Sequence, residues 1–263
     1  MDSDLTPEDN IYIRFEHVWK SFGDHVVLKG VSFDVRRGET VAVLGRSGVG
    51  KSVTLKHIMG FLKPDRGEIQ VAGRDVVQMT EAELGEMRRH VTMVFQSGAL
   101  FDSLTVGENV AYPLRERALR ESGLQSEDEI QARVDELLGL VDLSDARDVM
   151  PSDLSTGMKR AVAIARALAA APEAILYDEP TTMVDPLMAQ TVGDLILKLK
   201  RRRGLTSVVV THDTMLARKL ADRVVFLLDG GVAFFGPTKD MESSPEPLIQ
   251  EFLQLDEIVL PSG

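Results

Sequence analysis

Residues 45–52 read Gly45-Arg46-Ser47-Gly48-Val49-Gly50-Lys51-Ser52, and this stretch decides the fold. The apolar residues 40–44 before it predict a buried strand, and a helical pattern follows it through Gly60. In such a loop the glycines let backbone N–H groups converge on phosphate oxygens, Lys51 reaches the β- and γ-phosphates, and the Ser52 hydroxyl ligates magnesium. The strand before and the helix after make a chance glycine-rich turn a poor explanation, so the sequence predicts a nucleotide phosphate site.

Composition narrows the class of protein. The chain has 263 residues, enough to bury a large α/β core with an inserted subdomain. Its net charge of -11 argues against a general nucleic-acid-binding face. Because the chain has no cysteine, disulfides, thiolate metal sites and cysteine nucleophiles are excluded.

The first residues of the sequence are not expected to form a signal peptide. Residues 1–10 form an acidic tail without an apolar run, which is unlike a signal peptide, and no run of eighteen apolar residues occurs anywhere. We therefore expect a soluble, cytoplasmic protein.

Alternating apolar residues predict a small antiparallel β layer around the phosphate loop. The strands are expected over residues 11–16, 27–35 and 67–73. In the first of them Ile11, Ile13 and Phe15 form the apolar side, and they alternate with Tyr12, Arg14 and Glu16. From about Thr80 to Arg166 the pattern becomes helical, and Ser126 with Glu129 forms a capping box ahead of an apolar helix face. This pattern indicates an inserted helical subdomain over about residues 97–166.

Strand patterns then resume. Residues 174–177 and 207–210 are apolar runs separated by a helical stretch, and residues 224–228 and 232–235 flank a glycine turn typical of a hairpin. The fold expected is α/β: a P-loop NTPase core with an antiparallel β subdomain and an inserted helical subdomain.

Six motifs in order carry a family resemblance. After the phosphate loop come Gln96 behind a strand, Leu154-Ser155-Thr156-Gly157-Met158-Lys159-Arg160 opening a helix, Asp178-Glu179 ending an apolar strand, then Asp185 and His212. Over about residues 11–238 the chain resembles the ATP-binding subunits of ABC transporters, which implies an ATPase that uses ATP and Mg²⁺. Residues 239–263 remain as a C-terminal extension, in which a short helix is expected from Glu242.

The resemblance assigns the catalytic roles. Asp178 holds magnesium through water, and Glu179 is the general base, a role worth about two to four decades of rate. Gln96 touches magnesium and the attacking water and senses the membrane subunit. His212 follows a strand at the edge where α/β sheets bind ligands, a position at which a lone histidine is usually just a satisfied polar residue. By its place in the family's motif order, it looks like the γ-phosphate sensor.

Phe22 resembles the aromatic residue that stacks on adenine, with Trp19 as the nearby competitor. For either aromatic residue, a place in the hydrophobic core is the alternative.

In this family two chains enclose each nucleotide, so the resemblance implies a homodimer with composite sites. Ser155 and the Gly157 N–H then contact the γ-phosphate of the partner's nucleotide, and Asp185 communicates across the interface. Thr156 stands where the family usually has glycine, and Met158 where it usually has glutamine. The β-branched Thr156 restricts the backbone near the phosphate, so closure of the dimer is expected to be less tight or hydrolysis slower than is usual in the family. The chain is still expected to hydrolyse ATP.

The segment around Gln96 carries the substrate prediction. Residues 95–106 and 108–115, together with Met158, resemble the Mla/Mce-associated lipid-transport ATPases (MlaF-like). This resemblance implies a permease that docks near Gln96, a periplasmic Mce-type lipid-binding partner, a small cytoplasmic regulatory subunit, and a place at the inner membrane. Ala99, Leu100 and Phe101 are expected to form an apolar groove for a permease helix, or else subdomain core.

Two other functions remain open. A small-solute importer ATPase shares every nucleotide motif and differs in its permease. A non-transport ABC ATPase acting on ribosomes or DNA usually has two cassettes or a long coiled-coil insertion, and this sequence has neither. Residues 245–253 resemble a tail that clasps the dimer mate, with a helix packed on its own domain as the alternative.

Overall fold

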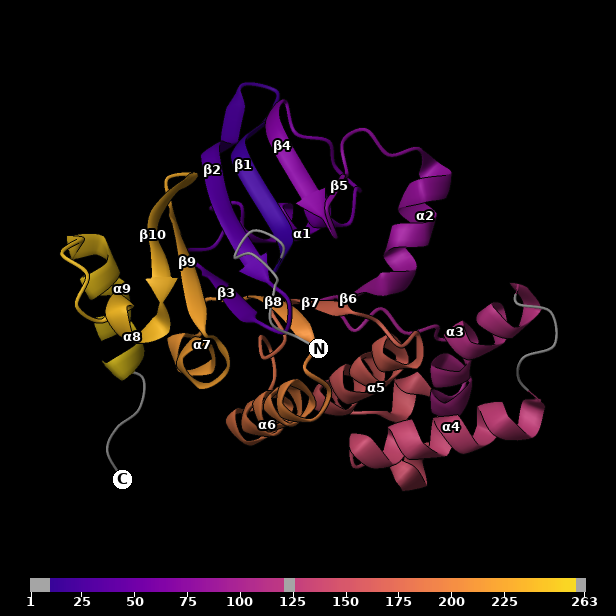
Figure 1. Cartoon of the computed structure of the whole chain (residues 1–263). Helices are drawn as coiled ribbons and strands as arrows, with labels where there is room; N and C mark the ends of the chain where they lie inside the picture. Colours follow the sequence, from indigo (N-terminus) through magenta and orange to yellow (C-terminus); the bar gives the residue numbers. More distant parts are fainter. Residues whose placement is uncertain (1–9, 121–125, 259–263) are drawn as a thin grey trace, which may run out of the picture. The chain divides into compact units, whose positions relative to one another are not determined.

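The computed structural model describes residues 10–120 and 126–258 and divides the chain into two compact units (Figure 1). Unit 1 contains residues 1–88 and 197–263, and unit 2 contains residues 89–196. The boundaries fall within helices α2 (Glu81–His90) and α6 (Pro186–Arg203). The acidic tail predicted over residues 1–10 lies outside the described residues except for its last residue.

The antiparallel layer of unit 1 confirms the predicted strands. Its order is β2-β1-β4-β5, with β1 (Ile11–Phe22), β2 (His25–Arg36), β4 (Arg66–Val71) and β5 (Arg74–Asp75). Phe15 and Phe33 stack across β1 and β2 with ring centroids 4.5 Å apart. Tyr12 was expected on the polar side of the alternation but is buried, because the Arg37 guanidinium lies over its ring at 4.7 Å.

The strand before the phosphate loop lies inside a second layer of unit 1. β3 (Thr40–Leu44) pairs in parallel with β8 (Thr206–Val210) and with β9 (Arg223–Leu228), and β9 pairs antiparallel with β10 (Gly231–Pro237). All five β3 residues are buried, as expected for a strand with neighbours on both edges. The predicted hairpin is confirmed. The helices that follow β3 and β8 are α1 (Lys51–Ile58) and α7 (Thr214–Leu220).

The Arg223 side chain of β9 connects β2 with the turn before β3. Its guanidinium binds the carboxylates of Asp34 and Glu39. Burial disfavours the charged form, but the hydrogen bonds to Glu39 and Asp34 outweigh it, so the pKa of Arg223 is raised. This network fixes the turn before β3 and so the start of the strand that leads into the phosphate loop.

The C-terminal extension packs on its own unit. After α8 (Thr238–Met241), helix α9 (Pro247–Ile258) buries Ile249 and Leu253 in a cluster that includes Ala42 and Leu44 of β3. In Figure 1 α8 and α9 lie beside β10 and α7. The sequence predicted a helix from Glu242, but α8 ends at Met241 and α9 begins at Pro247. Pro245 cannot continue a helix that starts at Glu242, whereas Pro247 suits a first helical position.

Replacing Ile249 with Ala is expected to lower the free energy of unfolding by about 2–4 kcal/mol, because the side chain is fully buried. Leu248→Ala is the matched control, since Leu248 is 38% exposed and its loss leaves less of a cavity. Urea denaturation of both variants measures the difference. Equal losses would contradict the packing of α9.

Unit 2 contains the predicted helices. α3 (Val106–Arg120), α4 (Glu127–Leu140) and α5 (Thr156–Ala169) pack together, with two short 3-10 turns, Ser144–Ala146 and Pro151–Asp153. The capping box of Ser126 and Glu129 is confirmed, and Ile130, Val134, Leu137 and Leu138 of α4 are buried. β6 (Val91–Val94) and β7 (Ala174–Asp178) pair in parallel.

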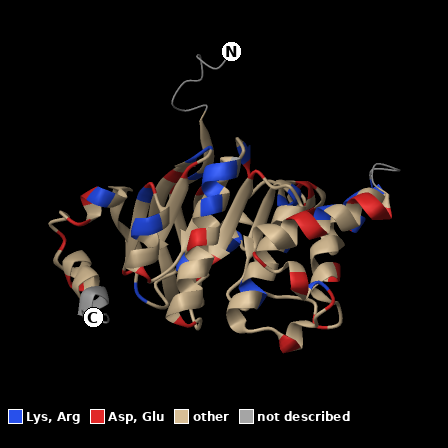
Figure 2. Cartoon of the chain, turned by 90° about the horizontal axis from the view of Figure 1, so that it is seen from below, with Lys and Arg blue, Asp and Glu red and all other residues tan. Residues whose placement is uncertain are grey.

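The surface is mixed in charge. In Figure 2 acidic and basic residues are interspersed along the helices that face the viewer. Among the described residues, no helix combines the length and the apolar character needed to span a bilayer.

Candidate functional site

The phosphate loop lies between β3 and α1, as predicted, and its glycines are required by its shape. Gly45 and Gly50 have φ of 147° and 108°, in the region that favours glycine. A Cβ on Gly45 would stand 2.6 Å from the Leu227 carbonyl oxygen, and one on Gly50 2.7 Å from a methyl of Leu28. The loop therefore accepts no side chain at either position without distortion.

Lys51 is folded into this loop. It is 6% exposed, and its ammonium donates to the carbonyls of Gly45 at 2.8 Å and Arg46 at 3.2 Å. Ser52 follows in the first turn of α1, whose N-terminus bears partial positive charge. A buried ammonium beside a helix N-terminus in a glycine-shaped loop fits a polyphosphate.

His212 lies at the same edge of unit 1 as the phosphate loop. Val43 of β3 is in register with Val210 of β8, and Gly45 and His212 each stand two residues after this pair. The His212 side chain is exposed. A ligand at this edge meets both chain segments, as the sequence predicted for unit 1.

The two candidate aromatic residues lie on the surface. Phe22 ends β1 and is 47% exposed, with the Lys20 ammonium 5.6 Å from its ring centroid, and Trp19 is 40% exposed. Neither ring belongs to the hydrophobic core, so the core alternative is wrong. Phe22 remains the better exposed of the two for stacking.

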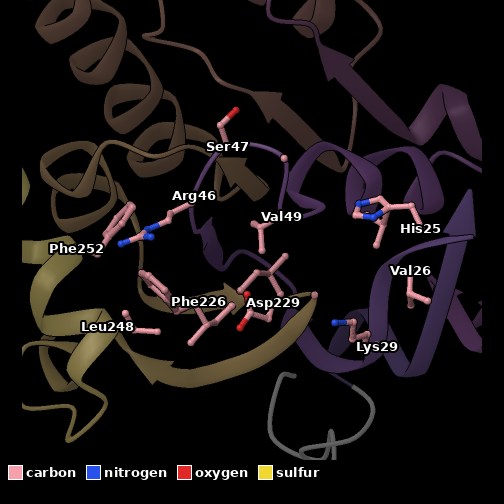
Figure 3. Close-up of a pocket in the computed structure, with 15 residues that line it drawn as sticks. His25, Val26, Lys29, Arg46, Ser47, Val49, Phe226, Asp229, Leu248 and Phe252 are labelled. Carbon is pink, nitrogen blue, oxygen red and sulfur yellow. The ribbon is translucent and has the colours of Figure 1, made fainter.

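A cavity of about 480 Å³ adjoins the phosphate loop within unit 1. Four loop residues line it, with residues from the start of β2, the turn between β9 and β10, and α9. In Figure 3 the Arg46 side chain extends toward Phe252 of α9, while Ser47 points away. Arg46 also pairs with Glu251 at 3.4 Å, an exposed contact that contributes little stability. Helix α9 thus forms one wall of the space beside the loop.

The two acidic residues of the candidate site end strand β7 of unit 2. Asp178 is the last strand residue and is 9% exposed, and Glu179 follows at 8%. Glu179 has φ of 48°, an uncommon value for a residue with a side chain. The Thr182 hydroxyl donates to its carboxylate at 2.9 Å. Glu179 is therefore a buried, held carboxylate rather than a solvent-facing one, and such strain gathers at functional sites.

The motif at the start of α5 has exposed residues and a buried glycine. Ser155 caps the helix by accepting from the Met158 N–H at 3.2 Å, and Ser155 and Thr156 are exposed. Gly157 is buried, and a Cβ there would stand 2.6 Å from the terminal carbon of Met188. The exposed face is thus free for a ligand, and glycine is needed for packing against α6.

Asp185 has a local role that the sequence did not indicate. Its carboxylate accepts from the Met188 N–H at 3.0 Å and caps the start of α6. Its own exposed position leaves it accessible from outside the unit.

The residues after Gln96 form an exposed apolar patch on unit 2. Its exposed members are Phe95, Ala99, Phe101 and Tyr112, here called the Phe101 patch. The Phe101 and Tyr112 rings lie 4.8 Å apart, and the Arg166 guanidinium lies 5.4 Å from the Phe101 ring. Of the predicted groove residues Ala99, Leu100 and Phe101, none is buried, so the core alternative is wrong for this segment.

Asn109, which sequence reasoning missed, fixes the shape of this patch. The side chain is fully buried; its amide donates to the carbonyls of Phe101, Leu104 and Thr105, and its oxygen accepts from the Phe101 N–H at 2.8 Å. A single asparagine thus satisfies a turn that no secondary structure pairs.

The side chains available as metal ligands are of the kind that Mg²⁺ takes. Within the described residues no group of three or more His, Cys, Asp or Glu side chains could hold a metal alone. Mg²⁺ takes few protein ligands, usually one or two carboxylates, and completes its shell with water and substrate phosphates. Unit 1 contains one side chain of the type that Mg²⁺ takes, the Ser52 hydroxyl, and unit 2 contains another, the Asp178 carboxylate.

Comparisons with known proteins agree with this geometry. The sequence profile described as "ABC transporter" matches residues 28–182. The chain is 38% identical to Protein TRIGALACTOSYLDIACYLGLYCEROL 3, chloroplastic, of Arabidopsis thaliana over 94% of this chain and 75% of that protein. It is also 38% identical to the methionine import ATP-binding protein MetN of Brucella abortus, over 92% of this chain and 64% of MetN.

A solved structure has the same fold. The dimeric post-hydrolysis state of the ATP-binding cassette MJ0796, bound to ADP and Pi, matches with a TM-score of 0.77 and 34% identity over 86% of this chain and 98% of that one. The predicted P-loop α/β fold, with its antiparallel β layer and helical part, is confirmed.

Proposed function

Because the chain belongs to the ABC transporter family, whose profile covers residues 28–182, we propose that its ATP hydrolysis drives a permease moving phospholipid or a related lipid. The lipid passes between the inner membrane and a periplasmic lipid-binding partner of the Mce type. The chain is the ATP-hydrolysing subunit of an ABC transporter, and it binds ATP.

Each candidate residue has a role in hydrolysis that its surroundings support. The phosphate loop and Lys51 hold the β- and γ-phosphates, and Phe22 stacks on adenine. Glu179 takes the proton of the attacking water, a role favoured by its burial and by its hydrogen bond to Thr182. Gln96 orients that water, and His212 contacts the γ-phosphate.

Magnesium completes the site. The residues that would hold it are Ser52, Gln96 and Asp178, of which Asp178 supplies the carboxylate. The ion, when bound, neutralises charge on the phosphate oxygens.

Cassettes of this family work as dimers with membrane permease components. We place the exposed Ser155 and Thr156, with the Gly157 N–H, Met158 and Asp185, against the nucleotide held by the partner copy. The free N-terminus of α5 supports this role, because the helix dipole favours phosphate there. The chain is peripheral, at the cytoplasmic face of the inner membrane, and a small regulatory subunit accompanies it.

The lipid substrate rests on the segment after Gln96. Overall sequence identity does not distinguish a lipid transporter from a small-solute importer, because a relative named for a galactolipid and a methionine importer are both 38% identical to this chain. The ordered Phe101 patch favours a permease that presents an apolar helix, and the sequence of this segment with Met158 favours the lipid class. An ATPase of a small-solute importer is the second candidate.

Co-purification tests the substrate directly. The tagged chain is extracted gently from membranes of its own cells, and its associated proteins and lipids are identified by mass spectrometry. A multi-span permease with an anchored lipid-binding protein and enriched phospholipid is expected. A permease with a small-solute-binding protein, or ribosomes without a membrane protein, would contradict the lipid function.

Replacing Tyr112 with Asp is expected to weaken permease binding by roughly thirtyfold, since a buried interface tyrosine often contributes about 2 kcal/mol or more. The amount of permease that co-purifies measures the effect, and ATP hydrolysis by the isolated chain should not change. Leu119→Asp is the matched control, because Leu119 lies on the same helix, is 85% exposed and stands outside the Phe101 patch. Undiminished permease with Tyr112→Asp would exclude the patch as the docking surface.

A further inference from the structure

Arg160 is a buried cation in the second turn of α5 that no part of the proposed mechanism uses. Its side chain is 2% exposed, and it stands five residues after Ser155 on the same helix. A buried guanidinium is costly unless its donors are satisfied. Its Nε has no hydrogen-bond partner among the described residues, so an apolar side chain of the same length would be the better choice for stability alone.

The other guanidinium nitrogens join two loops of the candidate site. Nη1 donates to the carbonyl of Phe95 at 2.6 Å, and Nη2 donates to the carbonyl of Thr182 at 3.3 Å. Phe95 is the residue directly before Gln96. All three residues belong to unit 2. One side chain therefore fixes the backbone of the glutamine loop and of the loop after β7.

The second contact continues to the candidate base. Thr182, whose carbonyl receives Nη2, donates its hydroxyl to the Glu179 carboxylate at 2.9 Å. Charge supports the same arrangement: burial lowers the pKa of Arg160, and the carboxylate of Asp178 opposes that shift. Arg160 of α5 is thus linked to Glu179 through two hydrogen bonds, with Thr182 as the only residue between them.

We propose that Arg160 is a positioning residue that ties Glu179 and Gln96 to helix α5, so that both follow the helix whose first turn carries Ser155. The inference rests on the proposed ATPase roles of Glu179 and Gln96. When the first turn of α5 engages the partner copy's nucleotide, any shift of the helix reaches both loops through the Arg160 guanidinium. Arg160 does not touch the reacting atoms; it sets where the water and its base stand.

Steady-state ATP hydrolysis by the full chain tests this role in three variants. Arg160→Met keeps the length and removes both hydrogen bonds, and kcat is expected to fall about ten- to a hundredfold, on the scale of small misplacements of catalytic groups. The KM for ATP should stay within about twofold, because the phosphate loop is untouched. Arg160→Lys, which keeps the charge but reaches one carbonyl at a time, should restore part of kcat. Arg147→Met is the matched control: Arg147 is half-buried in unit 2 and binds Asp135 and Gln131, so basal kcat should not change.

A second measurement separates positioning from simple loss of folded protein. In a Glu179→Gln background, Arg160→Met should add less than about twofold to the loss, because both changes act on one step. A merely structural Arg160 would lower kcat by the same factor in either background, and that result overturns the inference. So does an Arg160→Met kcat within twofold of the wild type. If Arg160→Met cannot be purified folded, Arg160→Lys decides, and an unchanged kcat there overturns it equally.

The outcome also distinguishes the two levels of the argument. If Glu179→Gln itself hydrolyses ATP at the wild-type rate, the proposed role of Glu179 fails and the inference fails with it. If Glu179→Gln loses turnover while Arg160→Met does not, only the inference about Arg160 is wrong.

Discussion

Replacing Glu179 with Gln is expected to lower the rate of ATP hydrolysis at least about a hundredfold, the usual scale of a lost general base. The amide has nearly the same shape and can still accept from the Thr182 hydroxyl, so the buried loop should keep its structure. ATP binding should persist because the phosphate loop belongs to another part of the chain. Phosphate release at saturating ATP, with fluorescent-nucleotide binding beside it, measures both quantities.

The control for this variant is Glu173→Gln. Glu173 lies directly before β7, is exposed, and pairs with His90 at 3.3 Å, so it changes charge at the other end of the same strand. Its turnover should match the wild type. If Glu179→Gln also turned over normally, another group would have to be the base.

Lys51→Ala is the second change with a large expected effect. It removes the ammonium that lies inside the phosphate loop and leaves the carbonyls of Gly45 and Arg46 without that donor. Both ATP affinity and turnover should fall, with kcat/KM reduced by about a hundred- to a thousandfold, as for other preorganised donors to phosphate or oxyanion charge. Unlike Glu179→Gln, this variant should not retain nucleotide.

Lys56→Ala tests whether charge alone is responsible. Lys56 lies on the same helix α1 but is exposed, and its removal changes the net charge equally. Affinity for ATP should stay near the wild-type value by equilibrium binding. A comparable loss in Lys56→Ala would show that long-range charge, not the position of Lys51 in the loop, is what matters.

Local sequence patterns predicted the parts of the fold that are encoded locally. The phosphate loop, the hairpin of β9 and β10 and the capping box at Ser126 each depend on residues a few positions apart, so spacing alone was enough. The burial of Tyr12 was not predicted. The Arg37 guanidinium covers its ring, and the alternation of apolar and polar residues along a strand does not indicate such a cation–π contact. The start of the C-terminal helix was placed at Glu242 rather than at Pro247, although Pro245 lies between them.

In the candidate site, too, local features could be predicted from the sequence and long-range contacts could not. The motif residues could be named from the sequence, since each motif has a chemical reason for its spacing. The contacts of Arg160 and Asn109 could not, because each side chain joins backbone carbonyls that are distant in sequence or lie in an irregular turn. The positive φ of Glu179 could not be predicted either, because residues other than glycine seldom adopt it and nothing in the sequence marks the exception.

The buried Asn109 has a thermodynamic consequence for whatever covers the Phe101 patch. Its amide already holds the turn at Phe101, Leu104 and Thr105, so the surface is ordered before a partner arrives. Association then loses little loop entropy, and the free energy of binding reflects fit and desolvation of the rings. Calorimetry of the complex should show a negative heat-capacity change from apolar burial without the large opposing entropy of a loop that folds on contact.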